Sequence, residues 1–335
     1  IPKSDDPKSV SVYSAAESLL CTVQYHQEYR QAIAHPTEYT MHIFITGATG
    51  FIGRVVSELA IQQGHTVHGL SRSPQGDEIL TSIGAIPIRG DLATHNILRE
   101  QSAKADVVFH LAFDHDFGKS YDQIIKLDTE AVDALAAPLV GTSKPLIAAS
   151  GILTVRPDQG DCVVNESAPY TKNTRVRRHV CEENALSWAE RGVRVNVVRL
   201  PPYVYGRANE TGFAARMVRM AVDNGVSGYI ASVKDRCVTS VYVDDAAALF
   251  LLLASDKTVK AGEIFHGTAD WDTTYGMLAK AIGRASWGPG QTIRAEEAEE
   301  KLGGFPVKLL WADNSGFEWK ACRETGVETR QAQAW

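Results

Sequence analysis

The chain has 335 residues, of which 44% are hydrophobic and 22% charged, a balance typical of a folded globular protein large enough for more than one domain. Its net charge of −6 and the lack of a Lys/Arg-rich run argue against nucleic acid as a partner. The longest apolar stretch, Ala246–Ala254, is far shorter than the roughly 20 residues needed to span a membrane, so no membrane partner is expected.

Five cysteines are scattered singly along the chain, at Cys21, Cys162, Cys181, Cys237 and Cys322. Their odd number and the lack of a CxxC pair argue against a disulfide framework and against a metal site. We therefore expect a reducing, cytoplasmic location and no bound metal.

Residues 1–40 precede the first predicted strand as an N-terminal extension. A polar start leads into a possible helix over Ser14–Ala34, which has only a loose apolar face. The extension lacks the basic start and apolar core of a secretory signal. A docked helix, a disordered tail and a segment foreign to the domain all fit this pattern.

The stretch His42–Gly53, HIFITGATGFIG, is an apolar strand that runs directly into a glycine-rich turn. Gly47 suits the tight turn, Gly50 allows a pyrophosphate to approach the backbone, and Gly53 allows the following helix to pack closely. The N–H groups at the start of that helix then face the phosphates. We predict a dinucleotide site rather than a plain glycine-rich turn, with these contacts: Gly47, Thr49, Gly50, Phe51, Ile52 and Gly53.

The end of the second predicted strand, Thr66–Leu70, indicates which cofactor binds. Enzymes that use NAD usually carry an acidic residue here for the ribose hydroxyls. This chain instead has Ser71, Arg72 and Ser73, and no carboxylate before Asp77. Because an arginine can pair with a 2′-phosphate and the serines can donate to it, we predict NADP(H), with NAD(H) the less favoured cofactor. An ordinary surface arginine is the alternative.

Strands and helices alternate from Met41 onward, which is typical of a parallel sheet with helices on both faces. Further strands are expected at Ala85–Arg89, Asp106–Leu111, Pro145–Ser150 and Val193–Leu200, and the clearest helices at Tyr121–Leu139 and Arg175–Arg191. The pattern predicts an α/β fold, a Rossmann-type doubly wound parallel sheet with a smaller C-terminal substrate lobe.

Residues 41–205 are expected to form the NAD(P)-binding domain. Residues 206–335 would form mainly the substrate-binding lobe, with 237–255 returning to the core of the first domain. In that returning segment an apolar stretch, Cys237–Val243, leads into a helix for which Asp244 or Asp245 is the expected N-cap.

Short motifs at the strand ends resemble those of the extended short-chain dehydrogenase/reductase superfamily, the NAD(P)-binding epimerase/dehydratase group. They are TGATGFIG at 46–53, GDL at 90–92, HLA at 110–112, AAS at 148–150, RLPPYVYG at 199–206 and VYVDD at 241–245. The resemblance covers about residues 41–330. It implies further cofactor contacts, from the adenine to the nicotinamide: Asp91, Leu92, Leu111, Ala112, Phe113, Pro201 and Pro202. It also implies that Ser150 hydrogen-bonds the reacting oxygen, and that a homodimer can form through the two clearest helices.

The superfamily's general acid/base pair, a tyrosine followed four residues later by a lysine, is missing. In the superfamily the lysine binds the ribose and lowers the pKa of the tyrosine. None of the 11 tyrosines of this chain has a lysine at that spacing. Thr174 or Arg175 would occupy the tyrosine position, and Arg178 or His179 the lysine position. The chain thus resembles atypical members that keep the cofactor fold without the pair.

The basic residues on this helix are candidates to replace that pair. Arg175, Arg178 or His179 could bind the nicotinamide ribose or a substrate anion, and His179 could also transfer a proton. The plainer alternative is an exposed basic helix face that pairs with Glu182 and Glu183.

The loop after the fourth strand, Phe113–Phe117, contains His115 between Asp114 and Asp116. Ligands of this fold bind outside the carboxyl ends of the strands, so the loop is well placed. A histidine between two carboxylates could act as a general base with a raised pKa. Alternatively, the aspartates are turn and capping residues and the histidine is exposed.

The segments expected on the substrate side are rich in apolar side chains: Phe113, Phe117, Ile152, Leu153, Tyr170, Tyr203, Phe213 and Tyr229. Such a pocket suits a medium-sized apolar molecule with one or two oxygens. Tyr170, Tyr203 and Tyr205 are nearby phenols, of which Tyr203 is the best candidate proton donor.

The leading hypothesis is an NADP-dependent oxidoreductase that acts on a small hydrophobic carbonyl or alcohol metabolite. Ser150 would hold the oxygen, and Tyr203, His115 or water would supply the proton. One alternative is a non-redox isomerase, dehydratase or cyclase that uses His115 and Asp114. The other is a regulatory protein that senses the cofactor without catalysis.

Overall fold

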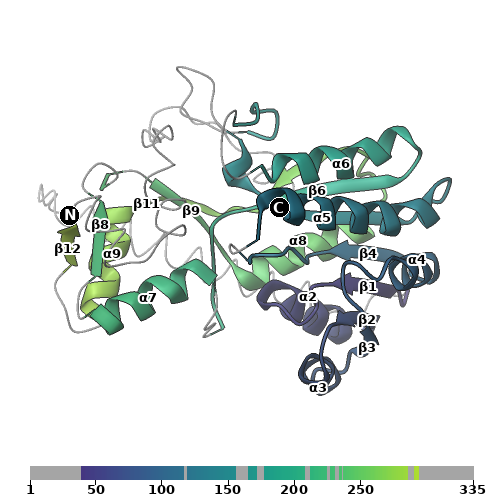
Figure 1. The fold of residues 1–335 in the computed structure, drawn as a ribbon, viewed down its shortest axis with the longest axis horizontal. Coiled ribbons are helices and arrows are strands. Elements are labelled where there is room, and N and C mark those ends of the chain that lie inside the picture. The colour runs from purple at the N-terminus through teal and green to yellow at the C-terminus, as the bar shows by residue number, and fades with distance from the viewer. Residues whose placement is uncertain are drawn as a thin grey trace, which may run out of the picture.

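The computed structural model describes residues 39–116, 119–155, 165–171, 177–207, 212–224, 227–230, 234–235, 237–285 and 290–293. Residues 1–38 of the expected extension over residues 1–40, its possible helix and residues 294–335 lie outside this part of the chain. In the described part, a seven-stranded sheet has the order β10-β6-β5-β4-β1-β2-β3, with every neighbouring pair parallel (Figure 1). The predicted doubly wound α/β fold is confirmed.

The strands of this sheet begin and end close to where the apolar runs predict them. They are β1 His42–Thr46, β2 Thr66–Ser71, β3 Ile86–Arg89, β4 Val107–His110, β5 Pro145–Gly151, β6 Arg194–Leu200 and β10 Ile264–His266. The sequence did not predict β10, which has only three residues and adds an edge beside β6.

The helices that connect these strands are α2 Phe51–Gln62, α3 Pro74–Ser82, α4 His95–Lys104, α5 Tyr121–Ala136 with a 3₁₀ turn over Ala137–Leu139, α6 His179–Glu190 and α8 Val243–Ser255. A capping box between Ser120 and Gln123 starts α5. Of the predicted helix Arg175–Arg191, the first two residues lie outside the described part.

The expected N-cap of α8 is wrong. Tyr242 is the N-cap, while Asp244 and Asp245 lie in the first turn. Carboxylates in that turn still favour the helix, because they face its positive end.

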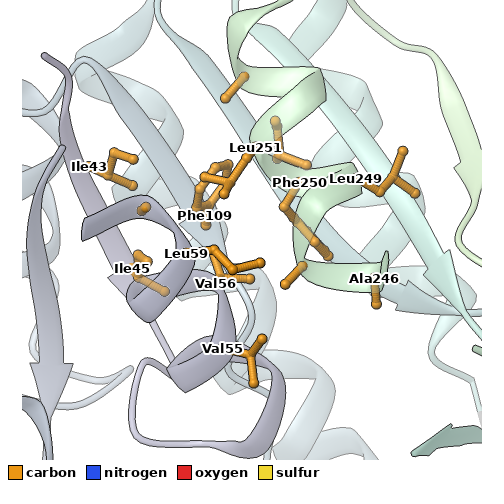
Figure 2. Packing of buried hydrophobic residues seen from close by; sticks show 14 of the residues in the cluster. Ile43, Ile45, Val55, Val56, Leu59, Phe109, Ala246, Leu249, Phe250 and Leu251 are labelled. Atoms are coloured by element: carbon orange, nitrogen blue, oxygen red, sulfur yellow. The ribbon is translucent and has the colours of Figure 1, made fainter. Parts of the chain in front are cut away.

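The two faces of the sheet are buried against different helices. Because side chains alternate along a strand, Ile43 and Ile45 of β1 face one way and Phe44 faces the other. The first pair belongs to the core formed with α2 and α8, and Phe44 to the core formed with α4, α5 and α6. Figure 2 shows the first core, in which the ring of Phe109 meets that of Phe250 edge to face at 5.8 Å.

In the described residues, the C-terminal lobe has two small sheets and two helices. The elements are β7 Tyr203–Tyr205, α7 Gly212–Asn224, β8 Ser227–Ile230, β9 Cys237–Tyr242, β11 Asp270–Thr274, α9 Tyr275–Ala285 and β12 Gly290–Ile293. The first sheet has the order β11-β9-β7, and the second pairs β12 with β8. The segment 237–255 therefore divides, since β9 belongs to the lobe sheet whereas α8 packs on α2.

Arg207 ties the end of β7 to the larger domain. Its guanidinium binds both carboxylate oxygens of Asp244 on α8, at 2.9 and 2.6 Å, and also pairs with Glu58 on α2. Arg207 has a φ of 48°, a region that residues other than glycine seldom adopt. These ion pairs hold the chain in that conformation where it leaves the sheet.

None of the helices in the described ranges is long and apolar enough to cross a bilayer.

Gly53→Ala should destabilise the protein by about 2–3 kcal/mol, because the backbone must move to make room for the added methyl group. A Cβ on Gly53 would lie 2.2 Å from the carbonyl oxygen of Gly47. Denaturant unfolding measures the change. Gly151→Ala is the control, because a Cβ there has no atom within 4 Å, and it should cost little. Equal losses in the two variants would contradict the packing argument.

Candidate functional site

The carboxyl ends of β1 and β4 lie side by side at the point where the strand order reverses, the usual ligand-binding place of such sheets. The loop after β1 crosses the loop after β4 in backbone contact. A Cβ on Gly47, which has a φ of 74°, would lie 2.7 Å from the amide nitrogen of Ala112. Glycine is therefore required for this crossing.

The start of α2 offers free donors to an anion. Gly50 is the N-cap with extended backbone, and no side chain caps the helix. The first backbone bond of the helix runs from the N–H of Arg54 to Gly50, at 2.9 Å. The first-turn N–H groups, which include those of Phe51, Ile52 and Gly53, thus have no partner within the helix. Such a helix end fits a pyrophosphate.

The three residues after β2 have different roles. The Ser71 hydroxyl is buried and donates to the carbonyl of Ser73 at 3.0 Å, while the Ser73 hydroxyl caps α3 by accepting from Gly76. Arg72 is exposed and forms no hydrogen bond or salt bridge with any residue that the structure describes. The geometry leaves Arg72 available to a ligand.

Asp91 and Leu92 shape the next strand end. The Asp91 carboxylate accepts from the N–H of Ala93 at 2.9 Å and from the hydroxyl of Thr94 at 2.8 Å, which fixes the turn before α4. Leu92 is partly buried against the core under that helix.

A chain of buried polar groups supports the loop after β4. The Thr46 hydroxyl hydrogen-bonds Nδ1 of His110 at 2.8 Å, and Nε2 of that ring lies 3.2 Å from Asp128 on α5. The N–H of Ala112 donates to the Thr46 hydroxyl at 3.4 Å. On the other side, the thiol of Cys181 on α6 is buried, and this burial and the charge of Asp128 raise its pKa.

Neither His110 nor Asp128 is among the site residues predicted from the sequence. The available signal was a carboxylate on the buried face of α5, where Ile124 and Ala131 are also buried. A buried carboxylate needs a partner, and the histidine of the HLA motif provides one.

Ser150 lies at the end of β5 and is 4% exposed. Its hydroxyl has no hydrogen-bond partner among the described residues. An unsatisfied buried hydroxyl costs free energy, which a hydrogen bond to a ligand oxygen or to an ordered water would recover.

The Arg178 side chain contacts both the end of β5 and the loop after β4. It immediately precedes α6, and its Nη2 donates to the carbonyl oxygen of Ala149 at 3.0 Å. The guanidinium carbon lies 4.0 Å from the centre of the Phe113 ring, in the geometry of a cation–π contact.

The predicted raised pKa of His115 is wrong. Partial desolvation and the charge of Arg178 lower the pKa of this ring, although its Nδ1 lies 3.1 Å from the carbonyl of Phe113. Asp114 is paired with Lys119 at 2.6 Å, which lowers the pKa of the carboxyl and offsets its charge. Phe117 lies outside the described residues.

The three candidate phenols are bound to other groups. Tyr203 is buried in the lobe core near Phe213 and Tyr229, where it donates to the sulfur of Met217 at 3.5 Å, and burial raises its pKa well above its usual range. The hydroxyl of Tyr170 donates to Glu182 at 3.0 Å, and burial and that carboxylate raise its pKa. Tyr205 lies 3.4 Å from Asp270. The burial of Tyr203 argues against a role in proton transfer.

Glu182 does not pair with the arginines of its own helix, as the plainer alternative supposed. It binds Arg199 of β6 at 2.9 and 2.6 Å, with side chains that are 0% and 2% exposed. Arg199 also donates to the carbonyl of Glu166 and to the ring of His266. Arg177 pairs with Asp122 on α5, and the His179 ring lies 5.4 Å from that of Tyr170.

No group of three or more metal-ligating side chains occurs in the described part of the chain.

The free energy of unfolding should fall as the pH falls from about 6.5 towards 4. Burial lowers the pKa of His266 from 6.5 to about 4, so between these values the unfolded chain binds more protons than the folded one. Denaturant unfolding at several pH values measures the slope.

His266→Asn should reduce that slope without abolishing it, because burial also lowers the pKa of His42 and His65. A slope identical to that of the wild type would contradict the assignment.

The chain matches known proteins over most of its length. Residues 43–266 match the model of the NAD dependent epimerase/dehydratase family. An uncharacterized protein of Saccharomyces cerevisiae is 33% identical over 87% of this chain and 95% of its own length. A 2-alkyl-3-oxoalkanoate reductase of Shewanella oneidensis is 24% identical, over 64% of this chain and 57% of that protein. The crystal structure of the Bordetella bronchiseptica enzyme WbmH in complex with NAD+ has a TM-score of 0.61 and 17% identity, and the match covers 76% of this chain and 86% of that one.

Proposed function

This chain belongs to the NAD dependent epimerase/dehydratase family and is an enzyme of the extended short-chain dehydrogenase/reductase type, and on that premise we propose that it is an NADP-dependent oxidoreductase for hydrophobic carbonyl or alcohol substrates. The observation that carries the proposal is the buried, unpartnered hydroxyl of Ser150 at the carboxyl edge of the sheet. The similarity to a 2-alkyl-3-oxoalkanoate reductase favours a ketone next to an apolar chain.

The residues around the strand ends fit a dinucleotide. A side chain at either Gly47 or Gly53 would meet backbone atoms, so both positions need glycine for the loop to pack in this way. With the loop so placed, the phosphates would bind at the start of α2. Arg72 would bind the 2′-phosphate, and Ala112 and Phe113 would lie beside the centre of the cofactor. The cofactor supplies the hydride, and the chain has to position the substrate and stabilise its oxygen.

Ser150 would donate a hydrogen bond to the substrate oxygen and stabilise the negative charge that develops there. In a site of this kind a positioned donor accelerates hydride transfer without the usual tyrosine. The proton would then come from water or through His115, whose lowered pKa keeps the ring neutral at pH 7. The burial of Tyr203 leaves these two sources.

The lobe of β7, β9, β11, α7 and α9 is proposed to cover the apolar part of the substrate, since β7 follows directly after the Pro201–Pro202 end of β6. Residues 41–205 would thus bind the cofactor, and most of the remaining chain would select the substrate.

Ser150→Ala should lower turnover about 10- to 1000-fold, the usual cost of losing a donor to a developing oxyanion. The dissociation constant for NADPH should stay within about twofold, because the hydroxyl touches substrate rather than cofactor. Turnover is followed as deuterium transferred from 4-deuterated NADPH to 2-methyl-3-oxooctanoate ethyl ester and other hydrophobic ketones.

Ser57→Ala is the matched control. Its buried hydroxyl bonds the carbonyl of Gly53 inside α2, at 2.7 Å, so its removal should leave turnover nearly unchanged. Equal activity of Ser150→Ala and the wild type would remove Ser150 from the reaction.

Arg72→Ala should raise the dissociation constant for NADPH about 10- to 100-fold and change that for NADH little, because only NADPH has the 2′-phosphate. Fluorescence titration with both cofactors measures this. Arg99→Ala, an exposed arginine on α4, should affect neither. Equal weakening of NADPH and NADH by Arg72→Ala would show that Arg72 does not select NADPH.

A further inference from the structure

Arg178 has a half-buried positive charge that lacks a negative partner among the residues the structure describes. Its protein contacts are the neutral carbonyl of Ala149 at 3.0 Å and the face of the Phe113 ring. Within the described ranges no carboxylate lies at salt-bridge distance from it. The adjacent Arg177 pairs with Asp122, and the buried Arg199 pairs with Glu182.

The two contacts of Arg178 fix the plane of its guanidinium and leave most of its donors unused. A guanidinium has five N–H groups in a planar fork that matches a carboxylate with two parallel bonds. Anchoring on Ala149 and Phe113 reduces the entropy that the side chain loses when an anion binds. The group is thus prepared to bind an anion.

A second unsatisfied group, the hydroxyl of Ser150, belongs to the residue that follows the carbonyl to which Arg178 donates. The carbonyl that Arg178 holds belongs to the peptide between Ala149 and Ser150, and Ser150 carries the buried hydroxyl without a partner. Both lie where β5 runs past its last pair with β4, between His110 and Ala148. The carbonyl that anchors the Arg178 guanidinium and the residue that carries the free Ser150 hydroxyl are therefore neighbours on β5.

We propose that this pair binds a 3-oxo acid, with the keto oxygen on the Ser150 hydroxyl and the carboxylate on Arg178. The inference rests on the proposed reductase function and names its substrate class. In a 3-oxo acid a single carbon separates the keto carbon from the carboxyl carbon, so the keto oxygen can bind Ser150 while the carboxylate binds Arg178. Arg178 is one of the two residues that the resemblance offers for the position of the ribose-binding lysine, and the experiments separate ribose binding from carboxylate binding.

The reaction is balanced with these groups. Bound NADPH would supply the hydride for the new C–H bond, the electron pair of the carbonyl π bond would move to oxygen, and one proton from water would complete the alcohol. The carboxylate is unchanged, the product is a 3-hydroxy acid, and NADPH becomes NADP+. Arg178 would also offset the repulsion between the carboxylate and the developing alkoxide.

The test compares 2-methyl-3-oxooctanoate with its ethyl ester, which keeps the ketone and lacks the charge. The wild type should reduce the acid with a kcat/KM about 100-fold above that for the ester, as expected for a desolvated charge pair. Arg178→Met should remove this preference by lowering kcat/KM for the acid about 100-fold while changing that for the ester less than about threefold. Arg178→Lys should retain part of the preference, and Arg177→Met, the neighbouring control, should retain all of it.

Binding is measured separately by calorimetry, with 3-hydroxyoctanoate added to the enzyme saturated with NADP+. The wild type should bind it and Arg178→Met should not, with NADPH affinity equal in both. If Arg178→Met instead weakens NADPH binding and affects acid and ester alike, the residue binds ribose and the inference is overturned while the reductase function stands.

The remaining outcomes separate the two claims. Arg178-dependent binding of 3-hydroxyoctanoate without reduction of either ketone would support the inference and overturn the reductase function. Lack of both binding and reduction would overturn the inference and the assigned substrate class together.

Discussion

The backbone contact between Gly47 and Ala112 is the constraint on which the site depends. It brings the loops after β1 and β4 together at the reversal of strand order, with no room for a side chain at Gly47. Buried hydrogen bonds from Thr46 to His110 and from His110 to Asp128 hold the ends of β1 and β4 in the same arrangement. The first of these loops leads into the start of α2. The second leads to Phe113, whose ring face contacts the guanidinium of Arg178.

Two arginines beside β5 illustrate how burial decides what a charge does. Arg199 is removed from water and is compensated by Glu182, with Tyr170 and His266 also in contact, so it stabilises the packing of α6 and the loop at 165–171 against β6. Removing one member of such a buried pair typically costs about 3–5 kcal/mol, because it leaves an uncompensated charge in the interior. Arg178 keeps partial access to solvent and is held by neutral groups, so its charge stays available for a ligand.

The sequence predicted the elements that depend on local pattern. The apolar runs located β1 to β6 within about two residues, and the spacing of glycines after β1 located the crossing, because both follow from backbone geometry. It failed where a partner comes from a distant element. Glu182 lies 17 positions from Arg199, and His110 lies 18 from Asp128, so neither pair has a local signature.

The same limit explains two other failures. His115 is flanked by carboxylates in the sequence, but Lys119 compensates Asp114 and Arg178 approaches from the start of α6. Tyr203 follows two prolines at a strand end, and yet its ring turns into the lobe core formed with α7 and α9. The direction of a side chain at the end of a strand depends on what packs beyond it.

The thiol of Cys181 has a consequence for experiments in solution. It is buried between α5 and α6, and burial together with the charge of Asp128 raises its pKa, which keeps it in the unreactive protonated form. Alkylating reagents can attack it only when α6 separates from α5. The rate at which Cys181 is labelled therefore measures the opening of these helices, and a ligand that bridges Ser150 and Arg178 should slow that rate, because Arg178 lies directly before α6.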